Sequence, residues 1–176
     1  MRATIIILIT LLLTACSSGI EGNRYAQLQP KFDPYTFFQG DIKAWGIVQD
    51  RDGNMIQQFV VDINAYQNES GQLILDETFE YLLGDGVKER VWKIRQQQNG
   101  SYVGRAGDIL AEASGETFGN AMNWRYEMDL PVGDTSYVVT FDDWMWAFDN
   151  NTLMNRSYIE KFGLTMAEVT IFMQKQ

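Results

Sequence analysis

The regular alternation of apolar and polar residues is the clearest feature of the chain. In residues 122–130, apolar side chains occupy every second position and polar side chains occupy the positions between them. The apolar positions are Met122, Trp124, Tyr126, Met128 and Leu130, and the polar positions are Asn123, Arg125, Glu127 and Asp129. Residues 72–83 alternate in a similar way. This period is typical of antiparallel strands with one buried face.

Turn sequences rich in Asp, Asn and Gly separate these segments. They occupy residues 50–54, 68–71, 84–86, 98–100, 119–120, 131–134 and 149–151. Such residues favour tight hairpin turns. Only Ser157–Val169 offers a helical alternative, of one turn at most, and residues 167–173 are predicted to form a closing strand. A succession of hairpins predicts an antiparallel meander.

The predicted fold class is all-β, with about eight to ten strands. A long meander leaves two exposed edges, and closure into a barrel removes both. We therefore expect a meander closed into a lipocalin-like (calycin) barrel. A β-sandwich is the alternative, and it needs a longer connection, for which the Gly-rich stretch 104–120 is the candidate.

The first residues have the layout of a bacterial export signal. Arg2 precedes an apolar run that is shorter than the about 20 residues needed to span a bilayer. Leu13-Thr14-Ala15-Cys16 resembles the lipobox of bacterial lipoproteins, and Cys16 is the single cysteine of the chain. The resemblance implies cleavage before Cys16 and lipidation of its thiol. We thus expect a signal peptide at 1–15, the lipidated cysteine and a polar tether at 16–34, and a β-barrel domain at 35–176.

The residues after the cysteine indicate where the lipoprotein resides. Ser17 and Ser18 follow Cys16, whereas an Asp there would resemble the signal for retention in the inner membrane. We therefore expect the protein at the outer membrane, on its periplasmic face, with the membrane as its partner through the N-terminal lipid anchor.

Composition narrows the possible functions. The chain carries a formal net charge of −9 and contains no histidine. Such an acidic protein would repel the phosphates of nucleic acids. The absence of histidine removes Ser-His and Cys-His catalysis and histidine metal sites. Carboxylates, Tyr and Lys remain available for acid–base chemistry, so this composition disfavours an enzyme without excluding one. We expect no cofactor and no metal site.

Asp142-Asp143-Trp144-Met145-Trp146 is the most unusual segment of the chain. On a strand, Asp142, Trp144 and Trp146 share one face, and Asp143 and Met145 share the other. A structural Asp–Arg bridge beside stacked tryptophans is one interpretation, with Arg125, Arg105 or Arg156 as the partner. A polar anchor inside a ligand cavity is the second interpretation.

The predicted ligand-binding residues combine this segment with two other strands. A first strand beginning near Phe38 carries small residues on one face, which leaves room for a ligand or a bend. The predicted cavity lining is Phe38, Ile42, Trp124, Met128, Trp144 and Trp146. Arg125 or Asp142 is the candidate partner of a polar head group, although the alternation places Arg125 on the outward face.

The block from Gly115 to Gly163 resembles a family of small bacterial outer-membrane lipoproteins of unknown function. The residues that carry the resemblance are Gly119-Asn120-Ala121, Asn123-Trp124, Asp142-Asp143-Trp144-Met145, Asn155-Arg156-Ser157 and Phe162-Gly163, together with Phe37-Phe38-Gln39-Gly40. The family looks lipocalin-like, and its genes are often found beside fatty-acid-modifying enzymes such as cyclopropane synthases. The resemblance implies a fold and a connection with lipids, without catalytic residues.

Three functional hypotheses follow. The first is a membrane-anchored barrel that binds or carries a hydrophobic ligand such as a fatty acid or lipid. The second is an envelope interaction or scaffold lipoprotein whose barrel is filled by its own side chains. The third is a lipid-modifying enzyme that uses Asp142 or Asp143 with a Tyr or Lys.

Overall fold

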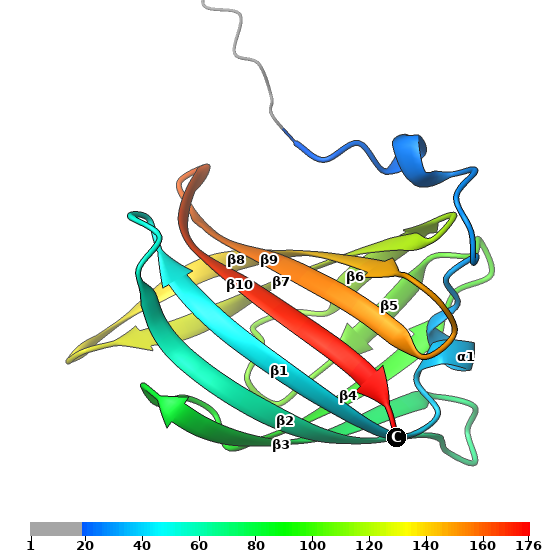
Figure 1. Ribbon diagram of the computed structural model, residues 1–176, viewed down its shortest axis with the longest axis horizontal. Helices are drawn as coiled ribbons and strands as arrows, with labels where there is room; N and C mark the ends of the chain where they lie inside the picture. The colour runs from blue at the N-terminus through cyan, green and yellow to red at the C-terminus, as the bar shows by residue number, and fades with distance from the viewer. Residues whose placement is uncertain (1–18) are drawn as a thin grey trace, which may run out of the picture.

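The computed structural model describes residues 19–176, which form a single closed barrel preceded by two short helical segments (Figure 1). The predicted signal peptide and Cys16 lie outside the described residues. The helical segments are η1 (Gly22–Tyr25) and α1 (Pro34–Phe37). The strands are β1 (Gly40–Asp50), β2 (Met55–Gln67), β3 (Leu73–Leu83), β4 (Glu89–Gln96), β5 (Tyr102–Arg105), β6 (Ala113–Phe118), β7 (Ala121–Val132), β8 (Thr135–Ala147), β9 (Thr152–Lys161) and β10 (Leu164–Lys175).

Every strand pairs antiparallel with its neighbours in sequence, and β1 closes the barrel by pairing with β10. The predicted all-β meander barrel is therefore confirmed, and it is consistent with a lipocalin-like barrel. The chain does not adopt the alternative β-sandwich. The helical alternative at residues 157–169 is wrong, because this segment belongs to β9 and β10. Positive φ angles of 54° at Phe162 and 75° at Gly163 form the tight turn between these strands.

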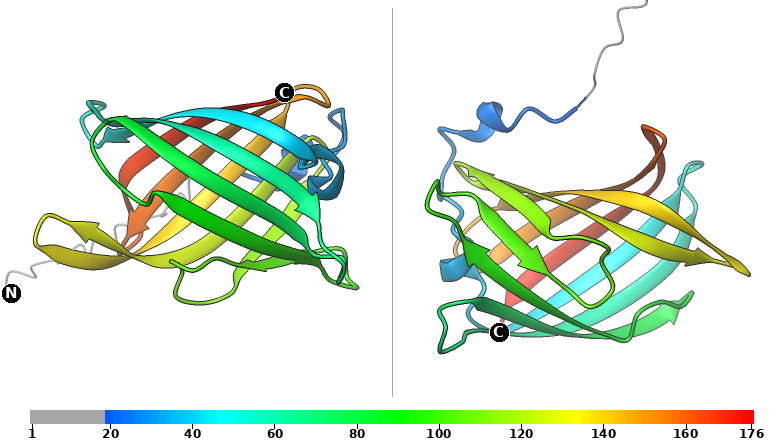
Figure 2. Two further views of the ribbon diagram at one scale, coloured as in Figure 1. Left: turned by 90° about the horizontal axis from the view of Figure 1, so that it is seen from below. Right: turned by 180° about the vertical axis from the view of Figure 1, so that it is seen from behind.

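The barrel has two different ends (Figure 2). At one end, which we call the plugged end, α1 lies against the turn after β2 and the backbone of β4. Asp33 caps α1 by accepting a hydrogen bond from the Tyr35 backbone N–H at 3.0 Å. The Tyr35 hydroxyl lies 3.2 Å from the carbonyl oxygens of Gly71 and Ile94, to which it can donate its proton. The side chains of Phe32, Phe37 and Phe38 are buried against one another. The opposite end, which we call the open end, carries the turns after β1, β3, β7 and β9.

The segment before α1 crosses the outer wall of the barrel. The Tyr25 ring lies 6.0 Å from the rings of both Trp144 and Trp146. The Phe32 N–H donates to the Gly119 carbonyl at 2.7 Å. A side chain at Gly119 would collide with the Tyr25 backbone, because its Cβ would lie 1.9 Å from the Tyr25 oxygen. The part of the predicted tether from Gly22 onward is thus packed on the barrel.

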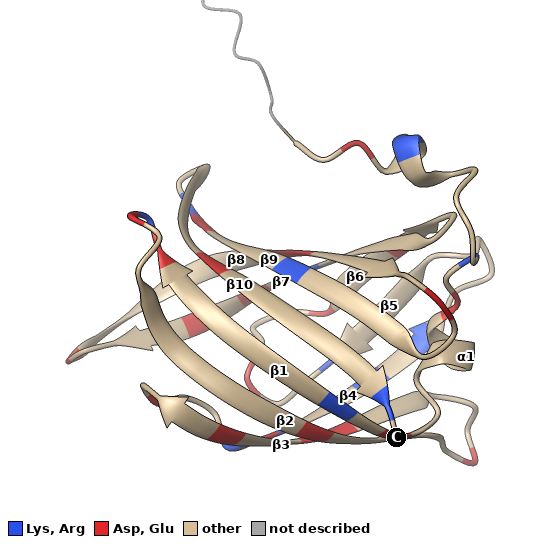
Figure 3. Cartoon of the chain, viewed as in Figure 1, with Lys and Arg blue, Asp and Glu red and all other residues tan. Residues whose placement is uncertain are grey.

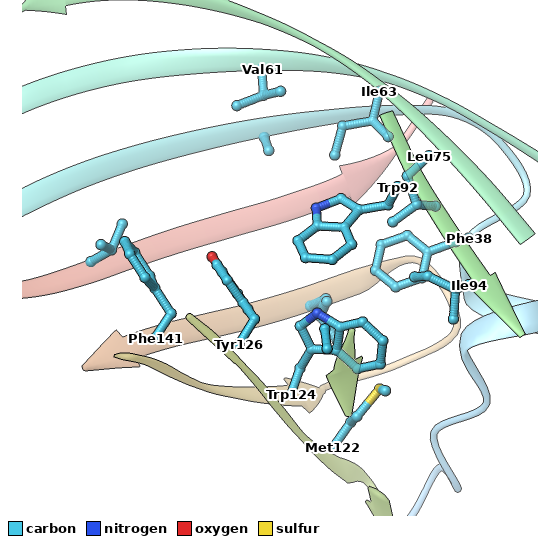
Figure 4. Close-up of a cluster of buried hydrophobic side chains, with 14 of the residues drawn as sticks. Phe38, Val61, Ile63, Leu75, Trp92, Ile94, Met122, Trp124, Tyr126 and Phe141 are labelled. Carbon is cyan, nitrogen blue, oxygen red and sulfur yellow. The ribbon is translucent and has the colours of Figure 1, made fainter. Parts of the chain in front are cut away.

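Aromatic side chains pack against one another in the half of the interior beside the plugged end. Trp92 packs edge-on against Trp124 and Tyr126, with ring centroids 5.6 and 5.2 Å apart (Figure 4). Gly104 and Gly115 make room for this cluster. A Cβ at Gly115 would lie 2.4 Å from the Trp124 ring, so a side chain there would displace the indole.

Candidate functional site

The barrel interior contains a cavity of about 1570 Å³. Pro34 and Phe38 of the plug line it at one end, and Ile56, Val132 and Phe162 line it at the open end. Its volume exceeds the roughly 300–1,000 Å³ that is usual for small-molecule pockets. Most of its lining is aliphatic or aromatic, and Trp92, Trp124 and Tyr126 point into it (Figure 4). The barrel is therefore hollow, and is not filled by its own side chains.

A group of ionisable side chains interrupts the apolar wall. We call it the inner polar cluster, and its members are Glu77 of β3, Arg90 of β4, Asp108 of the β5–β6 loop, Tyr126 of β7 and Asp143 of β8. Asp85, Asp129 and Lys161 also line the cavity, toward the open end. The other charged residues are spread over the strands and turns (Figure 3). The cluster is distinctive because ionisable groups from five separate segments converge on one cavity.

Arg90 and Asp108 form the central ion pair of the cluster. The Arg90 Nε lies 2.9 Å and the Nη2 lies 2.6 Å from Asp108 Oδ2, and the two side chains are 14% and 25% exposed. The guanidinium also lies 5.7 Å from the centre of the Phe79 ring. Both hydrogen bonds are charged at donor and acceptor, which makes them stronger than neutral ones, and they tie the β5–β6 loop to β4.

Glu77 and Asp143 are the unpaired acids of the cluster. Glu77 stands directly across from Arg90 in the β3–β4 register, and Asp143 stands directly across from Ser157 in the β8–β9 register. Asp143 is 8% exposed, and its Oδ1 has no hydrogen-bond partner among the described residues. Neither acid forms an ion pair within residues 19–176.

Burial shifts the protonation of these acids toward neutral pH. Loss of hydration raises the pKa of Glu77 to about 7, although nearby Arg90 opposes the shift. Burial likewise raises the pKa of Asp143 to about 7, against the effects of Ser157 and Arg90. Burial also keeps the Tyr126 hydroxyl protonated by raising its pKa well above the usual value. The cluster thus contains acids that exchange protons near neutral pH.

Residues 19–176 contain neither a metal-ligating cluster nor a membrane-spanning helix. No three carboxylates or other ligating groups of this range lie together in a way that could hold a metal ion. Within the same range, no helix is long and apolar enough to cross a membrane. The cavity with its inner polar cluster is therefore the candidate site.

Comparison with known proteins places the chain in a family. Residues 10–175 match DUF3833, a family described as protein of unknown function. The chain belongs to DUF3833. A search among curated proteins found no match for this sequence.

A solved structure shares the architecture of this DUF3833 chain. It is the crystal structure of a DUF3598-family protein of unknown function from Nostoc punctiforme, with a TM-score of 0.60 and 8% sequence identity. The match covers 84% of this chain and 51% of that protein, so the DUF3833 chain spans about half of its length. At this identity, the likeness shows the fold alone.

Three of the predicted ligand-binding residues line the cavity of the DUF3833 barrel. Phe38 closes its plugged end, and Trp124 and Met128 project from β7. Ile42 lies inside the barrel but is buried in the core and does not line the cavity. The sequence therefore located the β7 wall correctly.

The other four predicted residues, Arg125, Asp142, Trp144 and Trp146, do not line the cavity, which corrects that expectation. The Arg125 Nη1 lies 3.6 Å from Asp142 Oδ2, and the Arg125 Nη2 lies 3.3 Å from Glu160 Oε2, on the outer side of the wall. Tyr25 and Phe118 cover Trp144 with ring centroids 6.0 Å away. The Asp–Arg bridge beside stacked tryptophans is the arrangement observed. The inward residues of this segment are Asp143 and Met145, because neighbouring strand residues point to opposite faces.

The inner polar cluster was missed, although the alternation contained part of its signal. Glu77 falls between Leu75 and Phe79 in the inward register of β3. An acid at such a position loses hydration, which costs free energy unless a partner compensates for it. Asp143 falls between Phe141 and Met145 in the same way. Asp108 gave no such signal, since it reaches Arg90 from a loop without periodicity.

Proposed function

We propose that this DUF3833 protein binds a hydrophobic ligand, such as a fatty acid or another lipid, inside its barrel. The observation that carries the proposal is the cavity of about 1570 Å³, which is lined mainly by apolar side chains and reaches the open end. Burial of an acyl chain in such a cavity contributes about 0.8 kcal/mol for each CH₂ group removed from water. The long-chain ligand lies along the barrel and enters from the open end.

The proposal includes the membrane anchor predicted at Cys16. Since the chain packs on the barrel from Gly22 onward, the free tether between the lipid and the barrel is short. Six residues span at most about 20 Å when fully extended. A lipid-modified Cys16 would hold the barrel close to the periplasmic face of the outer membrane, where lipid ligands are available.

Native mass spectrometry tests the binding directly. The chain from residue 17, which contains the whole described barrel, is exported without its anchor and purified from the periplasm without detergent. We expect a lipid to co-purify at about one per barrel, and organic extraction identifies it. A bare protein mass, together with tryptophan fluorescence that does not respond to added long-chain lipids, contradicts the proposal.

Two neighbouring positions on β8 provide a matched control. Val139 lines the cavity, whereas Val138 is exposed on the outer side. We expect Val139→Trp to fill part of the cavity and to reduce the bound lipid, while Val138→Trp retains it. Equal lipid occupancy in the two variants would show that the lipid is bound outside the barrel.

A further inference from the structure

The inner polar cluster lies within the cavity, where a long-chain ligand would place a polar group. All five of its side chains line the cavity. The cluster lies partway along the cavity. Trp92 and Trp124 line the cavity on its plugged side, and Met128 and Leu130 line it toward the open end. A ligand that occupies the cavity therefore contacts the cluster.

The charges of the cluster are unbalanced toward acids. Arg90 is already matched by Asp108 at 2.6 Å, so the pair is close to neutral. Glu77 and Asp143 remain, and within residues 19–176 neither has a cationic partner at salt-bridge distance. The other ionisable member, Tyr126, keeps its proton and is neutral, so its hydroxyl can donate a hydrogen bond. The cluster thus has acceptors and negative charge to offer a ligand, but no unmatched cation.

Asp143 supplies an observation that points to a ligand. Its side chain is more than nine-tenths buried, it faces the cavity, and its Oδ1 has no partner among the described residues. A buried acceptor without a hydrogen bond costs about 1–3 kcal/mol, and more when it is charged. A donor on a bound ligand would satisfy this oxygen.

We propose that the inner polar cluster binds the head of the hydrophobic ligand, and that this head donates hydrogen bonds to Asp143 and Glu77 and carries no negative charge. A protonated amine fits best, because it neutralises an ionised carboxylate and donates several hydrogen bonds. A hydroxyl or an amide fits next. A carboxylate or phosphate fits worst, because it adds an unmatched negative charge beside the buried Asp143 and the half-buried Glu77. This inference rests on the proposed function and specifies its ligand.

Three ligands of equal chain length test the head-group preference. Dodecylamine, dodecanol and dodecanoate are titrated below their micelle-forming concentrations into the chain from residue 17, and Trp92 and Trp124 report binding by fluorescence. At mildly alkaline pH, we expect the amine to bind about tenfold more tightly than the carboxylate. Dodecanol is expected to lie between them.

Substitutions on the two faces of β8 connect this preference to the cluster. Asp143→Asn keeps the shape but removes the inward charge, and we expect it to abolish most of the preference for the amine. Asp142→Asn is the matched control, because Asp142 lies on the outer side with Arg125. Glu77→Gln provides a second inward variant, with Glu80→Gln on the outer face of β3 as its control. Thermal unfolding verifies that each variant is folded.

The possible outcomes separate the two proposals. Binding of all three ligands without preference, or a preference that survives Asp143→Asn and Glu77→Gln, overturns the head-group inference and leaves the lipid-binding function intact. Tighter binding of dodecanoate than of dodecylamine also overturns it. Failure of all three ligands to bind removes the proposed function and this inference together. An amine preference lost only in the inward variants supports both.

Discussion

The plugged end and the open end of the barrel are built in opposite ways. At the plugged end, Phe32, Phe37 and Phe38 are buried, and Tyr35 contacts carbonyls of two separate segments. At the open end, apolar side chains are exposed around the mouth of the cavity, and the β7–β8 hairpin extends beyond the wall (Figure 1). We call these exposed residues the apolar rim: Met55, Ile56, Leu82, Leu83, Val132, Tyr137, Phe162 and Leu164.

The difference between the two ends indicates a division of roles. A buried aromatic group that closes one end contributes to stability, because it removes apolar surface from water. An exposed apolar rim contributes little to the fold, and exposed apolar patches commonly mark contact surfaces. The buried aromatic residues of the plugged end thus set the depth of the cavity, and the apolar rim surrounds the route by which a ligand enters.

Removing an aromatic side chain from each end gives the largest contrast. We expect Phe38→Ala to lower the free energy of unfolding by about 3–5 kcal/mol, because it leaves a hole in a buried cluster. Phe162 is 91% exposed, so Phe162→Ala changes stability by no more than about 0.5 kcal/mol. Urea denaturation measures both values. Similar losses in the two variants would contradict the division of roles.

Between the two ends, the Arg90–Asp108 pair is expected to matter more than its counterpart on the outer wall. Arg90→Ala leaves Asp108 partly buried and unpaired, at a cost of about 2–3 kcal/mol of stability. Arg125→Ala removes an outer bridge whose arginine is 49% exposed, at a cost below about 1 kcal/mol. Chemical denaturation at matched pH compares the two variants. An equal cost would mean that the inner pair is as well hydrated as the outer one.

The inner acids are expected to make stability depend on pH. Their pKa values rise from 4.5 and 3.8 to about 7 on folding, so the folded state binds more protons than the unfolded state over this range. The free energy of unfolding should therefore fall as the pH rises from about 4 to about 7. The double variant Glu77→Gln, Asp143→Asn should lose this part of the slope. Denaturation curves across this range compare it with the parent chain, and unchanged slopes would contradict the expected protonation.

The smallest effect is expected from the rim, and it concerns the rate of ligand entry. Phe162→Ser should slow the uptake of a long-chain ligand from lipid vesicles by about a few-fold, with little change in stability. Phe148→Ser is the control, because Phe148 is also exposed, at 64%, but lies in the β8–β9 turn of the plugged end. Stopped-flow tryptophan fluorescence measures the uptake rate. Equal slowing by both variants would show that entry does not depend on the open end.

The sequence predicted the wall of the barrel better than it predicted its contents. Period-two alternation in residues 122–130 assigned Trp124 and Met128 to the inside and Arg125 to the outside, as the structure has them. It failed for Trp144 and Trp146, because both faces of β8 carry large apolar residues, with Phe141 and Met145 on the inner face. The outer face is covered by Tyr25, which comes from a segment far away in sequence. Local periodicity contains no information about such a distant cover.

The alternation of apolar and polar residues predicted neither α1 nor the inner polar cluster, for two different reasons. Asp33-Pro34 is a recognisable helix start, but a helix as short as α1 leaves no periodic signal. The cluster depends on the closure of the barrel, which brings Glu77, Arg90 and Asp143 from separate strands to one cavity. Only the inward register of the two acids was visible in the sequence.

The seam between β1 and β10 also determines how the chain must fold. It joins Ile42 to Lys175, and the Gln176 N–H donates to the Asp41 carbonyl at 2.9 Å. Contacts between residues so distant in sequence form slowly, because the intervening chain must first lose its freedom. Until the last strand arrives, the edges of β1 and β9 are open to pairing with other chains. Closing the seam therefore ends the period in which an unfinished barrel is vulnerable to aggregation.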